Sequence, residues 1–260
     1  MKQETEFRQA FKNINRVFSG ELNNYTKQHR ADILIITASN NESLPKNMQA
    51  TYQETEQLFD KAETIYKNTL DLQNPGDLNS LGELYLLRHA HNNSGDYLTK
   101  AKDTLSQAIT IIKDKNDIFS RSKAPKDIKK RNQYIESNYL LYKAYDMESE
   151  SIDPRYRLEN FDKQRKYLTE CIIIDKYNPQ YFYLYAELVF KNRNIIPKRE
   201  TPGRNVDPYT ENLQVALFYN TQALQFSINS NYAPSINDKA KLLDKEIRSK
   251  MSSYIKSLTC

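Results

Sequence analysis

The 260-residue sequence contains few of the residues that build tight turns. It has 5 glycines, 9 prolines and no tryptophan, against 19 tyrosines. Because β-hairpins and meanders depend on glycine- and proline-rich turns, this composition disfavours an all-β fold. The tyrosines suit helix interfaces, where the ring is dry and the hydroxyl meets water. The composition therefore favours an all-α protein.

Cysteine is scarce as well. Cys171 and Cys260 are the only two, which excludes a disulfide framework and favours a reducing compartment. Cys171 lies in an apolar run, and we interpret it as a packed thiol rather than a nucleophile. The first residues carry no apolar stretch typical of a secretory signal, and no segment reaches the ~18–20 apolar residues of a transmembrane helix. We expect an intracellular protein, either cytoplasmic or part of an organelle-associated complex.

Signals of catalysis are missing from the sequence. It has no glycine-rich phosphate loop, no G-x-S-x-G motif, and no carboxylate pair with a histidine nearby in sequence. His89 and His91 are two residues apart, so on a helix they point about 200° apart and cannot share a metal ion. His29 is the only other histidine. We expect no enzyme activity, no cofactor and no metal.

The positive charge is concentrated rather than spread. The formal net charge is +5, and residues 121–131 alone hold six basic side chains and one acidic one. Clustered cations can steer an acidic protein, an anionic lipid or a nucleic acid; a solvated loop is the alternative interpretation. The six basic residues are Arg121, Lys123, Lys126, Lys129, Lys130 and Arg131. A second basic group comprises Lys191, Arg193, Lys198, Arg199 and Arg204.

Apolar periodicity predicts about ten helices. Apolar side chains recur three and four residues apart, as in Phe7, Phe11, Ile14 and Phe18. The β-branched run at 33–36 could form a buried strand, but with no second strand to pair with it a helix is favoured. The predicted helices span about 7–18, 21–39, 46–72, 78–92, 96–114, 128–149, 157–176, 179–192, 209–228 and 235–257. Asp77 or Asn79 can cap the fourth of them.

Several of these helices carry a pairing signature. A leucine, then glycine or tyrosine, then an apolar residue three positions on occurs as Leu81-Gly82-x-x-Tyr85, Leu141-Tyr142-x-x-Tyr145 and Leu184-Tyr185-x-x-Leu188. A second pattern spaces small and large residues as Ala62-x3-Tyr66-x2-Thr69, Ala101-x3-Leu105-x2-Ala108, Gln164-x3-Leu168-x2-Cys171 and Ala216-x3-Asn220-x2-Ala223. The two patterns together resemble the first and second helices of tetratricopeptide repeats.

The resemblance covers about residues 50–228 and departs from the family in two ways. The small position opening the second pattern recurs after 39, 63 and 52 residues, whereas the family repeats about every 34. The family's peptide-clamp residues are missing, because Glu83 follows Leu81-Gly82 and Ala186 follows Leu184-Tyr185. Recognition of a C-terminal chaperone peptide is therefore disfavoured. A non-repeating helical bundle is the alternative interpretation.

The resemblance implies a right-handed α-solenoid of antiparallel helix hairpins that binds other molecules on an open concave face. We expect a helical pair at 1–44, the repeats at 45–234 with basic loops at 116–127 and 193–208, and a capping helix at 235–260. The predicted role is a non-catalytic scaffold for an acidic or peptide-like protein partner. An RNA- or DNA-associated subunit and a peptide-sensing regulator are the alternatives.

The expected contact residues come from the basic groups and from the tyrosine-rich segment near position 183, where an aromatic ring can line a binding surface. They are Arg121, Lys123, Lys126, Lys129, Lys130, Arg131, Tyr183, Lys198, Arg199 and Arg204.

Overall fold

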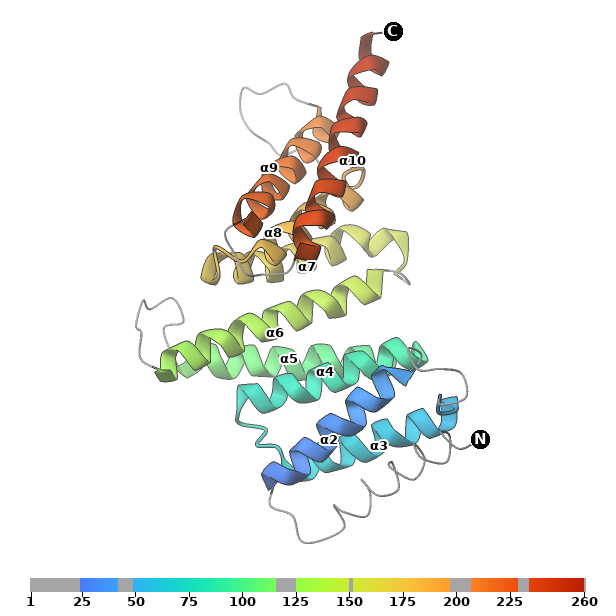
Figure 1. Ribbon diagram of the computed structural model, residues 1–260, viewed down its shortest axis with the longest axis vertical. Coiled ribbons are helices and arrows are strands. Elements are labelled where there is room, and N and C mark those ends of the chain that lie inside the picture. The colour runs from blue at the N-terminus through green and yellow to red at the C-terminus, as the bar shows by residue number, and fades with distance from the viewer. Residues whose placement is uncertain are drawn as a thin grey trace. The chain divides into compact units, whose positions relative to one another are not determined.

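The computed structural model describes residues 24–41, 49–115, 125–149, 152–196, 207–228 and 234–259. Within these ranges the chain is all-α, with nine α-helices, one 3-10 turn at Pro154–Tyr156 and no strand (Figure 1). The helix predicted at 7–18 lies outside them. The helices are α2 Asn24–Ser39, α3 Tyr52–Thr69, α4 Pro75–Asn92, α5 Gly95–Lys115, α6 Pro125–Ser149, α7 Arg157–Ile174, α8 Pro179–Asn192, α9 Pro208–Ile228 and α10 Pro234–Thr259.

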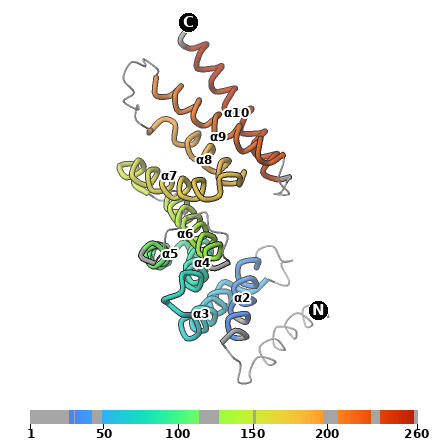
Figure 2. Tube along the Cα trace, turned by 90° about the vertical axis from the view of Figure 1, so that its left-hand side faces the viewer, coloured from blue at the N-terminus to red at the C-terminus, as the bar shows by residue number. Residues whose placement is uncertain are grey.

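The chain divides into two compact units. Unit 1 spans Met1–Ile118 and unit 2 spans Phe119–Cys260, so the boundary falls inside the segment predicted as one array at 45–234. In unit 1, α2 packs on α3 and α4 on α5; in unit 2, α6 packs on α7, α8 on α9, and α9 on α10 (Figures 1 and 2). Helices adjacent in sequence are therefore packed in neighbouring pairs.

The apolar run at 33–36 is helical, as favoured. Leu34 and Ile35 are buried in α2, whereas Ile33 and Ile36 are exposed. In a strand with one buried face, buried and exposed positions alternate, because side chains two residues apart share a face. Here two adjacent residues are buried between two exposed ones, which does not follow that pattern. The strand alternative is therefore wrong.

Two Asn-Pro dipeptides start helices in the same way. Asn74 caps α4, its side chain accepting a hydrogen bond from the Gly76 amide at 3.0 Å. Asn178 caps α8 by accepting from the Gln180 amide at 3.1 Å. In each case proline follows at the first helical position, where its missing N–H would have no helical partner. The expectation that Asp77 or Asn79 caps α4 was wrong, because the helix begins before either residue.

Two helices begin earlier than predicted. Helix α6 begins at Pro125, so residues 125–127 of the loop predicted at 116–127 are helical. Helix α9 begins at Pro208, after Asp207 accepts a hydrogen bond from the Thr210 amide at 3.0 Å. Proline fits the first turn of a helix, and the sequence interpretation had treated both prolines as loop residues.

Gly82 brings α4 and α5 into close contact. A Cβ atom placed on Gly82 would lie 2.6 Å from both Cγ and Cδ2 of Leu105, a side chain that is fully buried. Glycine inside a helix is destabilising relative to alanine. The close contact between α4 and Leu105 explains why glycine occupies this position. Gly82 is the second residue of the first-helix pattern on α4, and Leu105 is the central residue of the second-helix pattern on α5.

The four second-helix patterns fall on α3, α5, α7 and α9, the second member of each of the four pairs. Ala62, Ala101, Gln164 and Ala216, which open the patterns, are all buried. The first-helix patterns fall on α4, α6 and α8. The structure is thus compatible with a helical repeat whose spacing is uneven.

Arg88 links α4 to α3 through a buried ionic cluster. Its side chain donates hydrogen bonds to Glu56 at 2.8 and 3.1 Å, to Asp60 at 2.6 Å and to Glu63 at 2.9 Å. The guanidinium also lies 4.3 Å from the centre of the Tyr97 ring, on α5. Arg88 is only 5% exposed, so the carboxylates compensate a cation that would otherwise be buried alone.

This cluster makes the stability of unit 1 sensitive to acid. Burial raises the pKa of Glu63. The hydrogen bond and charge of Lys67, with the charges of Lys100 and Arg88, lower it by more, so the pKa of Glu63 lies below that of an ordinary glutamate. The unfolded chain therefore binds more protons near the ordinary glutamate pKa of about 4.3. Stability contributed by Glu63 is complete above that pH and is lost as pH falls through the folded pKa. Urea denaturation of the full chain between about pH 6 and 3 measures the loss.

The matched variant is Glu63→Gln, which cannot titrate. Its free energy of unfolding should fall less steeply over the same pH range. Equal slopes for the two proteins would contradict the assignment to Glu63.

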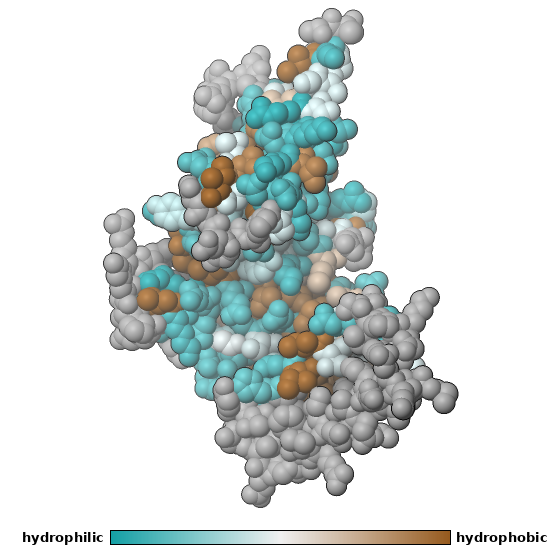
Figure 3. Space-filling model, in the orientation of Figure 1, coloured by the Kyte–Doolittle hydropathy of each residue, from teal (hydrophilic) through white to brown (hydrophobic). Residues whose placement is uncertain are grey.

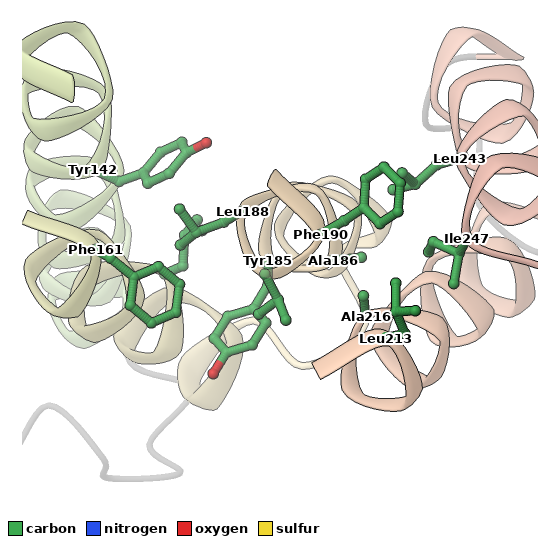
Figure 4. Close-up of a cluster of buried hydrophobic side chains, with 12 residues drawn as sticks. Tyr142, Phe161, Tyr185, Ala186, Leu188, Phe190, Leu213, Ala216, Leu243 and Ile247 are labelled. Atoms are coloured by element: carbon green, nitrogen blue, oxygen red, sulfur yellow. The ribbon is translucent and has the colours of Figure 1, made fainter. Parts of the chain in front are cut away.

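The core of unit 2 draws on all five of its helices. The cluster includes Tyr142, Phe161, Leu188, Leu213 and Ile247, one from each helix; Figure 4 shows the side chains of α8, α9 and α10 pointing toward one another. Its shared interior explains why α6–α10 form one unit. 

Helix α10 covers the end of that core with one face. Ala240, Leu243 and Ile247 are buried, and Leu242 and Ile255 are exposed. The surface over α10 is mainly hydrophilic (Figure 3). Asn220 of α9 donates a hydrogen bond to the Ala240 carbonyl at 2.8 Å, which fixes α10 against α9.

Candidate partner-binding pocket

A pocket of about 190 Å³ lies in unit 2 between α6, α7 and α8. Its buried lining residues are Tyr142 of α6, Asn160 and Gln164 of α7, and Leu188 of α8. Three of these four side chains carry polar groups. A pocket with a polar, buried lining differs from an ordinary packing defect, which is apolar.

Two carboxamides in this lining form a one-way chain of hydrogen bonds. Asn160 donates to the Glu148 carboxylate and to the Tyr145 carbonyl, both at 3.1 Å. Gln164 in turn donates to Asn160 Oδ1 at 2.5 Å and to the Tyr145 carbonyl at 3.3 Å. Both N–H groups of each amide face acceptors, so the orientation of each amide is determined.

The chain ends on an oxygen that has no partner. Gln164 Oε1 is buried and accepts no hydrogen bond, and the residue is only 2% exposed. Leaving a buried acceptor unsatisfied costs about 1–3 kcal/mol. A group of this kind in a native structure needs an explanation, and a ligand donor is one.

Tyr142 belongs to the hydrophobic cluster of unit 2 and also lines the pocket. Burial raises the pKa of this phenol far above its ordinary range, and the negative charges of Asp146 and Glu187 raise it further. Tyr142 is therefore a neutral hydroxyl at any physiological pH, able to donate and to accept.

The mouth of the pocket is charged. Asp146, Arg157 and Lys191 line it and are exposed. Glu187 is partly buried and lies 3.4 Å from the Lys191 ammonium. Two acidic and two basic groups thus line the pocket together with the neutral amides.

Among the predicted contact residues that the structure describes, Tyr183 hydrogen-bonds to a residue of this pocket, Glu187. Its hydroxyl donates to Glu187 at 3.2 Å. Its ring packs against the core cluster of unit 2 and against a second cluster formed by Phe182, Ala223 and Ala240. Burial first, then Glu187 and Glu246, raise the pKa of Tyr183 to about 12. It supports a pocket side chain, and its predicted contact with a partner stays a prediction.

The basic residues of α6 do not join the pocket. Lys126, Lys129, Lys130 and Arg131 belong to the first turns of α6, and the pocket residues of that helix begin at Tyr142. From Arg131 to Tyr142 the axis rises about 16 Å. Lys129 is exposed, and Lys130 and Arg131 are partly buried. Arg121, Lys123, Lys198, Arg199 and Arg204 lie outside the described residues.

Sequence reasoning missed Asn160, Gln164 and Glu148. One signal was present: Gln164 occupies the small opening position of the second-helix pattern, where the other three patterns have alanine. Asn220 is a similar departure on α9, and it also has a buried oxygen, Oδ1, without a partner. Polar residues at core positions of the pattern thus mark both unsatisfied acceptors.

Cys171 is packed in the way the sequence predicted. Its side chain is fully buried, with the sulfur 3.5 Å from the Ile135 carbonyl oxygen. Burial raises the thiol pKa well above its ordinary range, with smaller contributions from Glu170 and Asp175. The reactive thiolate is therefore suppressed.

Metal-ligand clusters and membrane-crossing helices are both missing from the part of the chain that the structure describes. In it, no group of three or more His, Cys, Asp or Glu side chains could hold a metal ion. Among the helices of the same part, none combines the length and apolar content needed to cross a bilayer.

Comparison with known proteins gives little. No protein-family model matches the sequence, and no curated protein matches it. Among solved structures, one described as "DHF58 filament" shares 11% identity, with 90% of this chain and 98% of that chain covered, at a TM-score of 0.26. A likeness this weak carries no argument about fold or function.

Proposed function

We propose that the chain is a tetratricopeptide-like, right-handed α-solenoid of helix hairpins that binds another protein without catalysing a reaction. The support is the recurrence of a buried alanine at the opening position of the second-helix pattern in three of the four pairs, together with the Gly82–Leu105 approach. Repeat units of this kind stack to form an extended surface, which suits them to binding. The sealed thiol of Cys171 and the absence of catalytic motifs agree with a binding role.

The partner would occupy the pocket between α6, α7 and α8. The observation that carries this proposal is Gln164 Oε1, a buried acceptor without a partner beside a polar pocket. Ligand pockets combine an apolar wall with a few polar groups that fix orientation. Leu188 and the Tyr142 ring provide the wall here, and the carboxamides provide the polar groups.

Nucleic-acid binding is less well supported. Lys129, Lys130 and Arg131 are consecutive on α6, so neighbouring side chains point about 100° apart and do not form one basic stripe. A protein that tracks phosphates gathers its cations on one face.

Capture of the full chain from its native cells, with cross-linking and mass spectrometry, tests the proposal. We expect a stoichiometric protein partner that survives nuclease treatment and forms cross-links at Lys191, on the rim of the pocket. A partner released by nuclease would favour the nucleic-acid alternative. Recovery of the chain alone, with no stoichiometric protein, would contradict a scaffold role.

A further inference from the structure

The amide chain in the pocket makes its last oxygen a stronger acceptor than an ordinary carboxamide. The chain starts at the Glu148 carboxylate, which accepts from Asn160, and Asn160 Oδ1 in turn accepts from Gln164; each amide also donates to the Tyr145 carbonyl. Hydrogen bonds in series polarise one another in the same sense. Each donated N–H therefore makes the oxygen of the same amide more negative, and Gln164 Oε1 receives the cumulative effect. The acceptor favours a positively charged donor, because charge-assisted hydrogen bonds are the stronger kind.

Two acidic groups of the pocket lining, Asp146 and Glu187, can pair with a cation. Burial is the main cause of the raised pKa of Tyr142, and the negative charges of Asp146 and Glu187 raise it further. The cation Lys191 is paired with Glu187 only across a 3.4 Å surface contact, and its side chain is 63% exposed. An exposed pair spaced four residues apart on a helix contributes little. A better-placed cation can therefore replace Lys191 on Glu187.

We propose that this pocket receives the ammonium or guanidinium group of a lysine or arginine side chain on the partner protein. The inference rests on the proposed function and names the group that the pocket recognises. Gln164 Oε1 and the Glu187 carboxylate accept its hydrogen bonds, and the Tyr142 ring and Leu188 contact its aliphatic stem. Since Gln164 Oε1 has no water-accessible surface, a lining side chain must move before the donor reaches it. The exposed chains of Arg157 and Lys191 are repelled by the incoming charge and can swing into solvent.

The probes are short peptides with acetylated and amidated ends, Ala-Lys-Ala, Ala-Arg-Ala and Ala-Glu-Ala, titrated into the full chain. The side-chain amide signals of Gln164 in an NMR spectrum report binding at the site itself. We expect the lysine or arginine peptide to shift these signals in a saturable way, and the glutamate peptide to leave them unchanged. Shifts from the glutamate peptide alone would overturn the proposal.

Lys191→Met tests whether the pocket prefers a positively or a negatively charged ligand. The variant should not disturb the fold, because Lys191 is exposed. Removing the competing rim cation should tighten binding of the cationic peptide about two- to fivefold. Weaker binding in this variant would show that the pocket prefers an anion, and would overturn the proposal.

Gln164→Leu should weaken binding at least about tenfold, with circular dichroism to verify the helical content. Glu187→Gln, which keeps the shape of the side chain, should weaken it about fivefold.

A free amine is the other source of the same chemistry, and n-butylammonium is its probe. Tighter binding of the lysine peptide than of n-butylammonium assigns the site to a protein side chain. Equal or tighter binding of the amine would overturn that assignment. Failure of every cationic probe, in a chain that still captures a protein partner, would overturn the pocket inference while the proposed function stands.

Discussion

Replacing Arg88 with methionine is expected to destabilise unit 1 by about 3–5 kcal/mol. The substitution keeps a long apolar stem but removes the cation shared by three carboxylates. Glu56 and Glu63 have side chains only 18% and 12% exposed, so they would remain partly buried with much of their compensation gone. Breaking a buried ionic cluster from one side is more damaging than replacing all of it.

Hydrogen exchange on the full chain measures this effect where it occurs. Amides of α3 and α4 should exchange faster in Arg88→Met than in the original protein, by a factor set by the lost free energy. The triple variant Arg88→Met, Glu56→Gln and Glu63→Gln should recover much of the protection, because it removes the two partly buried charges as well. No recovery in the triple variant would contradict an electrostatic origin.

Arg155→Met is the matched control. Arg155 also donates to a carboxylate, that of Asp153, at 2.7 Å, but its side chain is 80% exposed. Water already solvates both groups of this pair, so we expect no measurable change in stability. A large effect at Arg155 would show that ion-pair geometry matters here more than burial.

The second large effect is expected where Gly82 meets Leu105. Leu105→Ala should destabilise the protein by about 2–5 kcal/mol, because it removes fully buried methyl groups and leaves a cavity. Gly82→Ala should be destabilising as well, since overpacking of about 1–3 kcal/mol exceeds the gain of about 1 kcal/mol in helix propensity. Combined, the two changes should cost less than their sum, because the new methyl group enters the space that Leu105 vacates.

Urea denaturation of the four proteins in this double-mutant cycle gives the coupling free energy. Gly95→Ala is the control, since a Cβ atom on Gly95 would meet nothing within 4 Å. It should be neutral or slightly stabilising. Additive effects of the Gly82 and Leu105 changes would show that the two helices do not depend on this contact.

The sequence was sufficient for the fold class and for most of the helices, for physical reasons that particular residues make clear. Scarce glycine and proline disfavoured an all-β fold, and regular apolar spacing identified helical faces. The pattern through Ala101, Leu105 and Ala108 named a fully buried stripe of α5 correctly. Helix starts were predicted less accurately. Three helices begin at Pro75, Pro125 and Pro208, and these prolines were interpreted from the sequence as turn or loop residues.

The pocket could not be predicted in the same way. It depends on Glu148, Asn160 and Gln164, which come together only when α6 and α7 pack. Periodicity reports which face of a helix is buried, but not which partner a buried amide finds. Arg88 was missed for the same reason, since its three carboxylates lie on α3, at least 25 residues away in sequence. In both places a polar residue on a buried face was the available signal.

The packing of Cys171 has a practical consequence. Its thiol is shielded by α6 and has a raised pKa, so an alkylating reagent can modify it only after α7 separates from α6. With Cys260 replaced by serine, it is the one thiol in the chain. The rate of its alkylation under native conditions then reports how often these two helices separate. A ligand bound between α6, α7 and α8 should lower that rate in proportion to its occupancy.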